Sequence, residues 1–159
     1  MDRIPITKRG FENLQKELEN LKKVERPKNI VAIEEARAHG DLSENAEFDA
    51  AKERQAFIEG RISELAYKIG NADVIDTKTM KVEDKAIFGC VVVLENIDTG
   101  DEVKYQIVGP DESNIEKGRI SCSSPVGKAI IGREVGEEIT IQAPAGKRTY
   151  EIVDILLET

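Results

Sequence analysis

Four acidic side chains, Asp41, Glu44, Glu47 and Asp49, lie close together between Arg37 and Lys52, and no lysine or arginine separates them. Carboxylates are the ligands that Mg²⁺ accepts, usually one or two together with waters and phosphate oxygens. Two carboxylates on an exposed segment form only a weak magnesium site by themselves. They form a strong site when they are brought to a partner that already holds metal and phosphodiester, where a second ion can activate water for in-line attack. These residues therefore suggest donation of magnesium ligands to another molecule's active site.

A structural role is also open for the first two acids. Gly40 tolerates a positive φ angle and is typical of a helix end. Asp41 can then cap the next helix, and Glu44, three residues later, completes a capping box. Against capping alone, acids continue beyond these two positions, and Leu42 and Phe48 leave apolar groups near an exposed point.

Helical patterns flank the acidic stretch on both sides. Apolar residues step by three and four, as in a coiled-coil seam, at Phe11, Leu14, Leu18 and Leu21, and resume at Ile30, Val31 and Ile33. The same stepping runs through Ala51, Gln55, Ile58, Ile62, Leu65, Ile69 and Ala72. Two helices, at about 8–39 and 42–71, with a short connection predict an antiparallel hairpin about 45 Å long.

The first helix is disturbed at Glu25-Arg26-Pro27. Pro27 either kinks a continuous helix or begins a new one in its first turn. We expect one bent helix, with a break near residue 26 as the alternative. Thr7 is the predicted N-cap. His39, at the far end, is interpreted as a cation favoured by the helix dipole rather than as a ligand or base.

The C-terminal half changes to an alternating pattern. Strands are predicted at 87–95, 102–108, 119–123, 137–142 and 148–157, with a hairpin turn at 98–101. Ser124 as N-cap, Pro125 at the first helical position and Gly132 as the stop predict one short helix. The predicted fold is therefore α+β: a coiled-coil hairpin at 1–75 with its acidic tip at 40–49, then a small antiparallel sheet with one short helix at 76–159.

Composition restricts the compartment and the partners. The formal charge is −8, and an acidic chain lacks the basic footprint that tight binding to free duplex DNA requires. No apolar run is long enough to span a bilayer, and the first residues do not form a signal peptide, so we expect a cytoplasmic protein without a membrane partner. Cys90 and Cys122 are interpreted as buried free thiols in a reducing compartment.

Two long signatures resemble those of the bacterial Gre transcript cleavage factors. The tip signature runs from Ala36-Arg37 through Gly40-Asp41-Leu42-x-Glu44-Asn45-x-Glu47-Phe48 to Ala51-Lys52. The second runs from Ser124-Pro125-Val126-Gly127 to Ile131-Gly132, and the resemblance covers nearly all of the chain. It implies a C-terminal domain similar to FK506-binding proteins, which docks on RNA polymerase, and a coiled coil that enters the secondary channel of the polymerase.

The resemblance also implies roles for individual residues. Asp41 and Glu44 would be the catalytic, metal-binding pair, holding a second Mg²⁺ jointly with the polymerase. The polymerase, and not the factor, would then hydrolyse the 3′ end of backtracked nascent RNA. The positions that match polymerase docking are Ser123, Ser124 and Pro125.

Basic residues on the arm match positions that contact the extruded RNA. Arg37 and Lys52 are the matching residues. Lys28 and Arg54 are further candidates, because the predicted hairpin places Lys28 near the height of Lys52. The alternative for each is an ordinary solvated helix charge, since most exposed charges contribute little.

Three other functions stay open. The first is a polymerase-binding inhibitor of the same architecture, although the intact pair Asp41 and Glu44 favours a cleavage factor. The second is a peptidyl-prolyl isomerase or chaperone, against which the C-terminal half has only Phe88, Tyr105 and Tyr150 as aromatics for an apolar pocket. The third is a structural coiled coil with a capped tip. For the cleavage factor, we expect a monomer.

Overall fold

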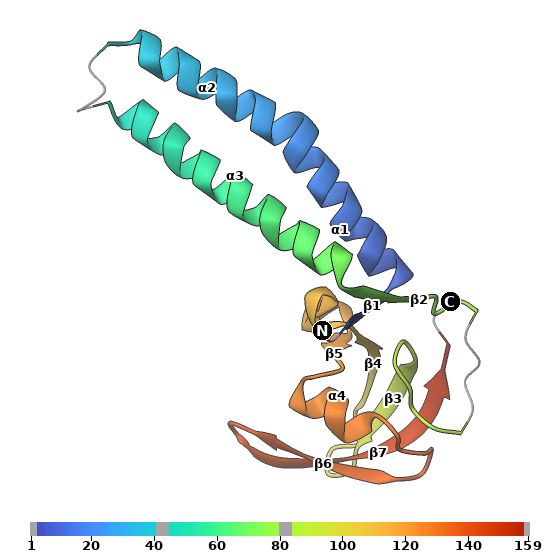
Figure 1. Ribbon diagram of the computed structural model, residues 1–159. Coiled ribbons are helices and arrows are strands. Elements are labelled where there is room, and N and C mark those ends of the chain that lie inside the picture. The colour runs from blue at the N-terminus through green and yellow to red at the C-terminus, as the bar shows by residue number, and fades with distance from the viewer. Residues whose placement is uncertain (1–2, 41–44, 80–83, 158–159) are drawn as a thin grey trace. The chain divides into compact units, whose positions relative to one another are not determined.

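The computed structural model describes residues 3–40, 45–79 and 84–157, and the chain divides into two units (Figure 1). One unit is Phe11–Asn71, and the other combines Met1–Gly10 with Ala72–Thr159. The observed division differs from the one predicted at residue 75, because the helical unit begins only at Phe11 and ends at Asn71. The reason is a parallel pairing of strand β1 (Ile4–Thr7) with β2 (Ala72–Ile75), which no local sequence pattern reveals.

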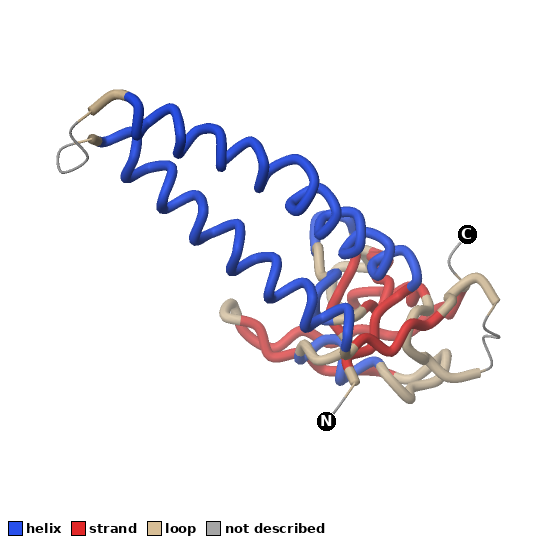
Figure 2. The backbone as a smooth tube through the Cα atoms, turned by 45° about the horizontal axis from the view of Figure 1, so that its top comes forward, coloured by secondary structure: helices blue, strands red, loops and turns tan. Residues whose placement is uncertain are grey.

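The helical unit is the predicted antiparallel hairpin. It contains α1 (Lys8–Asn20), a π-helical segment at Leu21–Glu25, α2 (Arg26–Ala38) and α3 (Ala46–Gly70). Figures 1 and 2 both show α2 and α3 running side by side. Along α3 the predicted seam is confirmed at Ala51, Ile58, Ile62 and Leu65, which are all buried. Of its other predicted members, Gln55 and Ile69 are half-buried, and Ala72 belongs to β2.

The π-helical segment shifts the seam of the first arm by one residue. Leu14 and Leu21 are buried, and the next buried seam residues are Asn29, Ile33 and Ala36. The step from Leu21 to Asn29 is eight residues instead of seven, because the wider π turn holds one extra residue.

The π-helical segment accounts for the disturbance expected near residue 26. The first arm stays one continuous helix, as expected, because Glu25 and Arg26 keep right-handed helical dihedral angles, and Pro27 lies just after the π-helical segment. The expectation that Ile30 and Val31 continue the seam is wrong: they are 45% and 51% exposed, because the seam beyond the π-helical segment runs through Asn29, Ile33 and Ala36.

Ion pairs flank the seam on the surface of the hairpin. Arg61 binds Glu17 through two hydrogen bonds of 2.5 and 2.9 Å, from Nε and one terminal nitrogen. Arg26 binds Glu59 in the same bidentate manner, at 3.0 and 2.8 Å. The hydrogen bonds that Arg61 donates to Glu17 lower the pKa of the Glu17 carboxyl and raise the pKa of Arg61. These pairs join the two arms at separate heights.

The second unit contains a five-stranded sheet in the order β5-β4-β3-β7-β6. Its strands are β3 (Val91–Asn96), β4 (Glu102–Val108), β5 (Arg119–Ser121), β6 (Glu138–Ala143) and β7 (Gly146–Leu156). The predicted hairpin turn joins β3 to β4, but β3 begins at Val91 instead of residue 87. The sheet is mixed rather than antiparallel, because the connection after β4 carries two 3₁₀ turns, Pro110–Glu112 and Ile115–Lys117, and returns β5 parallel to β4.

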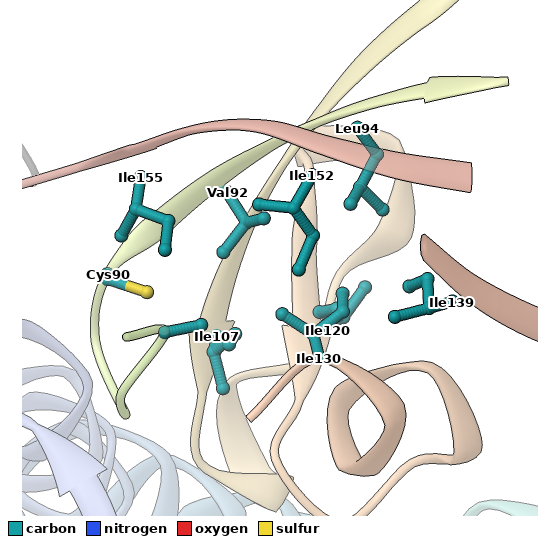
Figure 3. Packing of buried hydrophobic residues seen from close by; sticks show 10 residues of the cluster. Cys90, Val92, Leu94, Ile107, Ile120, Ile130, Ile139, Ile152 and Ile155 are labelled. Atoms are coloured by element: carbon teal, nitrogen blue, oxygen red, sulfur yellow. The ribbon is translucent and has the colours of Figure 1, made fainter. Parts of the chain in front are cut away.

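One apolar cluster fills the space between the sheet and the short helix α4 (Pro125–Ile130). Figure 3 shows Ile130 of α4 among Ile107, Ile120 and Ile152 from three strands. Cys90 belongs to this cluster and is buried, as predicted, whereas Cys122 is half-buried at its border. Both thiols are free, and burial raises the pKa of each. They act as small core residues.

The carboxylate of Glu112 joins the beginning of α1 to the loop that follows β4. It accepts hydrogen bonds from the backbone N–H of Thr7 and of Gly109, both at 2.9 Å, and from the Thr7 hydroxyl. The Thr7 hydroxyl oxygen in turn accepts from the N–H of Gly10 at 3.1 Å, which confirms Thr7 as the predicted N-cap. Gly10 leaves room for this carboxylate, because a β-carbon there would overlap the Glu112 side chain.

Two glycine-to-alanine changes should therefore have opposite effects on stability. Gly10→Ala forces Glu112 away from its donors and should lower the free energy of unfolding by about 1–3 kcal/mol. Gly60→Ala, in the middle of α3 with no atom near the added carbon, should raise it by about 0.5–1 kcal/mol. Urea unfolding of both variants measures the difference. Stabilisation by both would show that Glu112 does not hold the start of α1.

The pair Arg61–Glu17 should make the stability of the hairpin depend on pH. The pKa of Glu17 is lower in the folded chain than its ordinary value near 4.5, so the contribution is complete above that value and is lost as the pH falls through the folded pKa. Glu17→Gln should remove less than about 1 kcal/mol at pH 7, because both side chains are partly solvated. Thermal unfolding from pH 7 to 3 should show the parent converging on the variant. Exposed Glu12→Gln is the control, and parallel curves for Glu17→Gln would contradict the assignment.

Candidate functional site

The acidic stretch lies between the end of α2 and the beginning of α3. His39 is the C-cap of α2, and the backbone N–H groups of His39 and Gly40 donate to the carbonyl oxygens of Ala36 and Arg37, respectively. Gly40 follows with a φ angle of 104°, in the left-handed region that favours glycine. The predicted helix stop at Gly40 is confirmed.

Asp41 and Glu44, the predicted metal ligands, lie outside the described residues. The structure does, however, assign the cap of the next helix. The side-chain oxygen of Asn45 accepts a hydrogen bond from the N–H of Phe48 at 3.1 Å, and α3 begins at Ala46. The predictions that the second helix begins near residue 42 and that Asp41 caps it are therefore wrong. Asparagine caps as well as aspartate does, so local rules could not choose between the two positions.

The remaining acids of the stretch have a structural explanation. Glu47 and Asp49 lie in the first turn of α3, where the helix dipole favours negative charge. The Nε2 atom of His39 lies 3.9 Å from a carboxylate oxygen of Glu47, and both side chains are largely exposed. His39 therefore sits at a helix C-terminus, as interpreted from the sequence, and faces an acid of the opposite helix.

The basic residues near the tip differ in how they are held. The guanidinium carbon of Arg37 lies 5.9 Å from the centre of the Phe48 ring, so an aromatic face of α3 supports a cation of α2. The ammonium of Lys52 is exposed and donates to the side-chain oxygen of Gln55 at 3.1 Å. Both cations therefore remain on the surface of the arm, where a phosphate can reach them.

Arg54 and Lys28, the two further candidates for RNA contact, differ in the contacts that they make within the arm. Arg54 forms an ion pair with Glu25 at 3.2 Å and lies 5.5 Å from the Phe57 ring, so its charge is already balanced within the arm. Lys28 is exposed beside the seam residue Asn29, whose amide donates to the carbonyl oxygen of Ala51 at 3.0 Å. That bond places Lys28 at the height of Lys52, as expected from the hairpin pairing.

The predicted docking residues lie at the beginning of α4. Ser124 is the N-cap, accepting from the N–H of Gly127 at 3.1 Å and donating to the carbonyl oxygen of Ser121 at 2.7 Å. Pro125 occupies the first turn, and the hydroxyl of Ser123 lies 2.8 Å from that of Ser121. A β-carbon on Gly127 would overlap the Ser121 carbonyl, so the second signature has a structural basis. Docking through Ser123, Ser124 and Pro125 stays a prediction.

Comparisons with known proteins cover both units. Residues 4–74 match a family model described as "Transcription elongation factor, N-terminal", and residues 81–157 match "Transcription elongation factor, GreA/GreB, C-term". The chain belongs to the GreA/GreB family of transcription elongation factors. The resemblance drawn from the two signatures is confirmed, and with it a function in transcription elongation.

The relatives in this family match along their whole length. The chain is 55% identical over 157 residues to transcription elongation factor GreA of Thermodesulfovibrio yellowstonii, covering 99% of each chain. It is 53% identical over 155 residues to GreA of Alkalilimnicola ehrlichii, covering 98% of each. Among solved structures, GreA factor homolog 1 (Gfh1) of Thermus thermophilus is 30% identical, with coverage of 96% and 98% and a TM-score of 0.44.

Sequence reasoning missed two asparagines of this site. Asn29 and Asn45 each donate to a backbone carbonyl of the opposite helix, Ala51 and Ala36 respectively. A polar residue at a seam position is the sequence signal for Asn29, but only after the π-helical shift is known.

Within the described ranges, no helix combines the length and the apolar character needed to cross a membrane.

Proposed function

We propose that this factor binds RNA polymerase as a cytoplasmic monomer and inserts its helical arm into the secondary channel. Asp41 and Glu44 then help to hold a second Mg²⁺ in the polymerase active site, which hydrolyses the 3′ end of backtracked nascent RNA. The factor is not itself an enzyme in this proposal, because the polymerase supplies the rest of the active site. Family membership and the intact acid pair support it.

One observation carries the proposal beyond the family name. Asn45 caps α3, so the capping of that helix does not account for Asp41 or for Glu44. Two acids follow a helix stop at Gly40 and precede a helix capped by another residue. A role outside the chain explains why both positions carry a carboxylate.

The donor set fits the metal that the proposal requires. When bound, a second Mg²⁺ would activate a water and stabilise the charge that develops in phosphodiester hydrolysis. Asp41 and Glu44 supply hard carboxylate oxygens, and Mg²⁺ typically takes one or two of these from protein. Water and phosphate oxygens complete its shell, so the free chain needs no complete metal site.

The arm has the length and the stiffness that delivery requires. The 25 residues of α3 extend about 37 Å at 1.5 Å per residue. Its buried seam and the cross-helix pairs Arg61–Glu17 and Arg26–Glu59 oppose bending between the arms. The chain's own contribution is therefore to carry two carboxylates to a distant site and to hold them there.

The decisive test changes charge but not shape at the tip. Asp41→Asn and Glu44→Gln each remove one anionic ligand, and α3 keeps its Asn45 cap. The single-turnover cleavage rate in backtracked polymerase complexes at saturating factor should fall by orders of magnitude, because each 1.4 kcal/mol of lost transition-state stabilisation is about tenfold in rate. Unfolding and polymerase binding should stay unchanged, and added Mg²⁺ should recover part of the loss.

Asp49→Asn, which removes an exposed acid from the first turn of α3, is the matched control and should cleave at the parental rate. Parental rates for the Asp41 and Glu44 variants would refute metal delivery. Tight binding of the unmodified factor without any stimulated cleavage would instead favour an inhibitor of the same architecture.

Contacts with the extruded RNA should be separable from metal delivery. Arg37→Ala and Lys52→Ala should weaken engagement of backtracked complexes, and more factor should restore cleavage. Because each variant loses about one phosphate contact, its affinity should depend less steeply on salt, by about one unit of log–log slope. Arg54→Ala should change engagement little, because Glu25 already balances that charge. If the affinity of all three variants and of the parent depends on salt in the same way, Arg37 and Lys52 are ordinary surface charges that do not contact RNA.

A further inference from the structure

The side chain of Asn45 contacts both helices of the arm at the same time. Its oxygen accepts from the N–H of Phe48 at 3.1 Å, which caps α3. Its amide nitrogen donates to the carbonyl oxygen of Ala36 at 2.7 Å, in the last turn of α2. Capping uses only the oxygen, so the second bond needs a separate explanation.

The bond to Ala36 joins two points that are distant along the chain. Ala36 is 2% exposed on the seam of the hairpin, and it precedes the helix stop at Gly40. The Asn45 amide therefore fixes the start of α3 against the end of α2. The looser contacts at this height, 5.9 Å between Arg37 and the Phe48 ring and 3.9 Å between His39 and Glu47, do not constrain the backbone in the same way.

A second asparagine sets the same register further along the arm. The amide of Asn29, on α2, donates to the carbonyl oxygen of Ala51, on α3, at 3.0 Å, and Asn29 is buried. The two asparagines thus donate in opposite directions across one seam. A buried polar residue in an apolar seam fixes register at a cost in stability, because only one alignment satisfies it.

We propose that Asn45 is a positioning residue for transcript cleavage. By joining the end of α2 to the start of α3, it fixes the two helix ends between which Asp41 and Glu44 stand in the sequence. This role rests on the proposed function, because it matters only if those carboxylates are delivered to a reacting site. A displacement of about 1 Å at such a site can cost about 10²-fold in rate.

Two substitutions separate positioning from capping. Asn45→Asp and Asn45→Ser keep a side-chain oxygen for the Phe48 N–H, and aspartate and serine cap as well as asparagine does. Aspartate has no donor for the Ala36 carbonyl, and the serine hydroxyl lies one bond nearer the backbone than the asparagine amide nitrogen, so it does not reproduce the bond. Aspartate adds a charge and serine does not, so a shared defect cannot come from charge.

The chain provides a matched control at the other end of α3. The amide nitrogen of Asn71 donates to the carbonyl oxygen of Tyr67 at 2.8 Å, within one helix and not across the hairpin. Asn71→Asp and Asn71→Ser lose the same kind of bond without releasing α2 from α3. These controls should match the parent in every assay.

The first readout is amide hydrogen exchange in the free protein. The amides of His39 and Gly40 donate to the carbonyl oxygens of Ala36 and Arg37, both at 3.3 Å. Loss of the Asn45 bond should speed exchange of these two amides at least fivefold, with little change in the midpoint of unfolding. This measurement requires no polymerase. It therefore tests the hydrogen bond between Asn45 and Ala36 even if the unmodified factor stimulates no cleavage and the proposed function fails.

The second readout is single-turnover cleavage in backtracked complexes. Both Asn45 variants should bind polymerase as the parent does, and their rate at saturating factor should fall about 10- to 100-fold. Parental rates in both variants would overturn the positioning role, whatever the exchange shows. Amide exchange rates at His39 and Gly40 equal to those of the parent would show that the bond between Asn45 and Ala36 does not hold the two helix ends together.

Discussion

The seam of the helical arm contains one extra residue, and every contact from there to the tip depends on it. The π-helical segment Leu21–Glu25 makes the step from Leu21 to Asn29 eight residues long. With a regular seven-residue step, Lys28 instead of Asn29 would occupy the seam position that faces α3. The insertion instead places Asn29 there, where its amide meets the Ala51 carbonyl, and keeps Lys28 on the surface.

Polar bonds to the backbone set positions that apolar packing leaves open. Apolar contacts are not directional and tolerate a shift of one helix along another. Asn29 and Asn45 remove that freedom, because each side-chain amide has one carbonyl partner on the opposite helix. In the other unit, Glu112 does the same for the beginning of α1, with three donors converging on one carboxylate.

These assignments separate structural side chains from those available to a partner. Asn45 caps α3, Ser124 caps α4 and Glu25 balances Arg54, so these groups are occupied within the chain. Exposed cations such as Lys52 stay accessible on the arm. The proposed chemistry thus depends on few residues, and the rest of the arm determines where they stand.

The sequence by itself predicted the features that depend on local preference: the hairpin, the seam of α3, the Thr7 cap and the helix that begins at Pro125. Its two signatures identified the family. Only the tertiary structure decided the parallel pairing of β1 with β2 and of β4 with β5, because hydrogen bonds between segments distant in sequence leave no local pattern. It also decided that Asn45 caps α3 and not Asp41. Both residues cap equally well, and the carbonyl of Ala36, across the hairpin, offers a second bond that only an amide at position 45 makes.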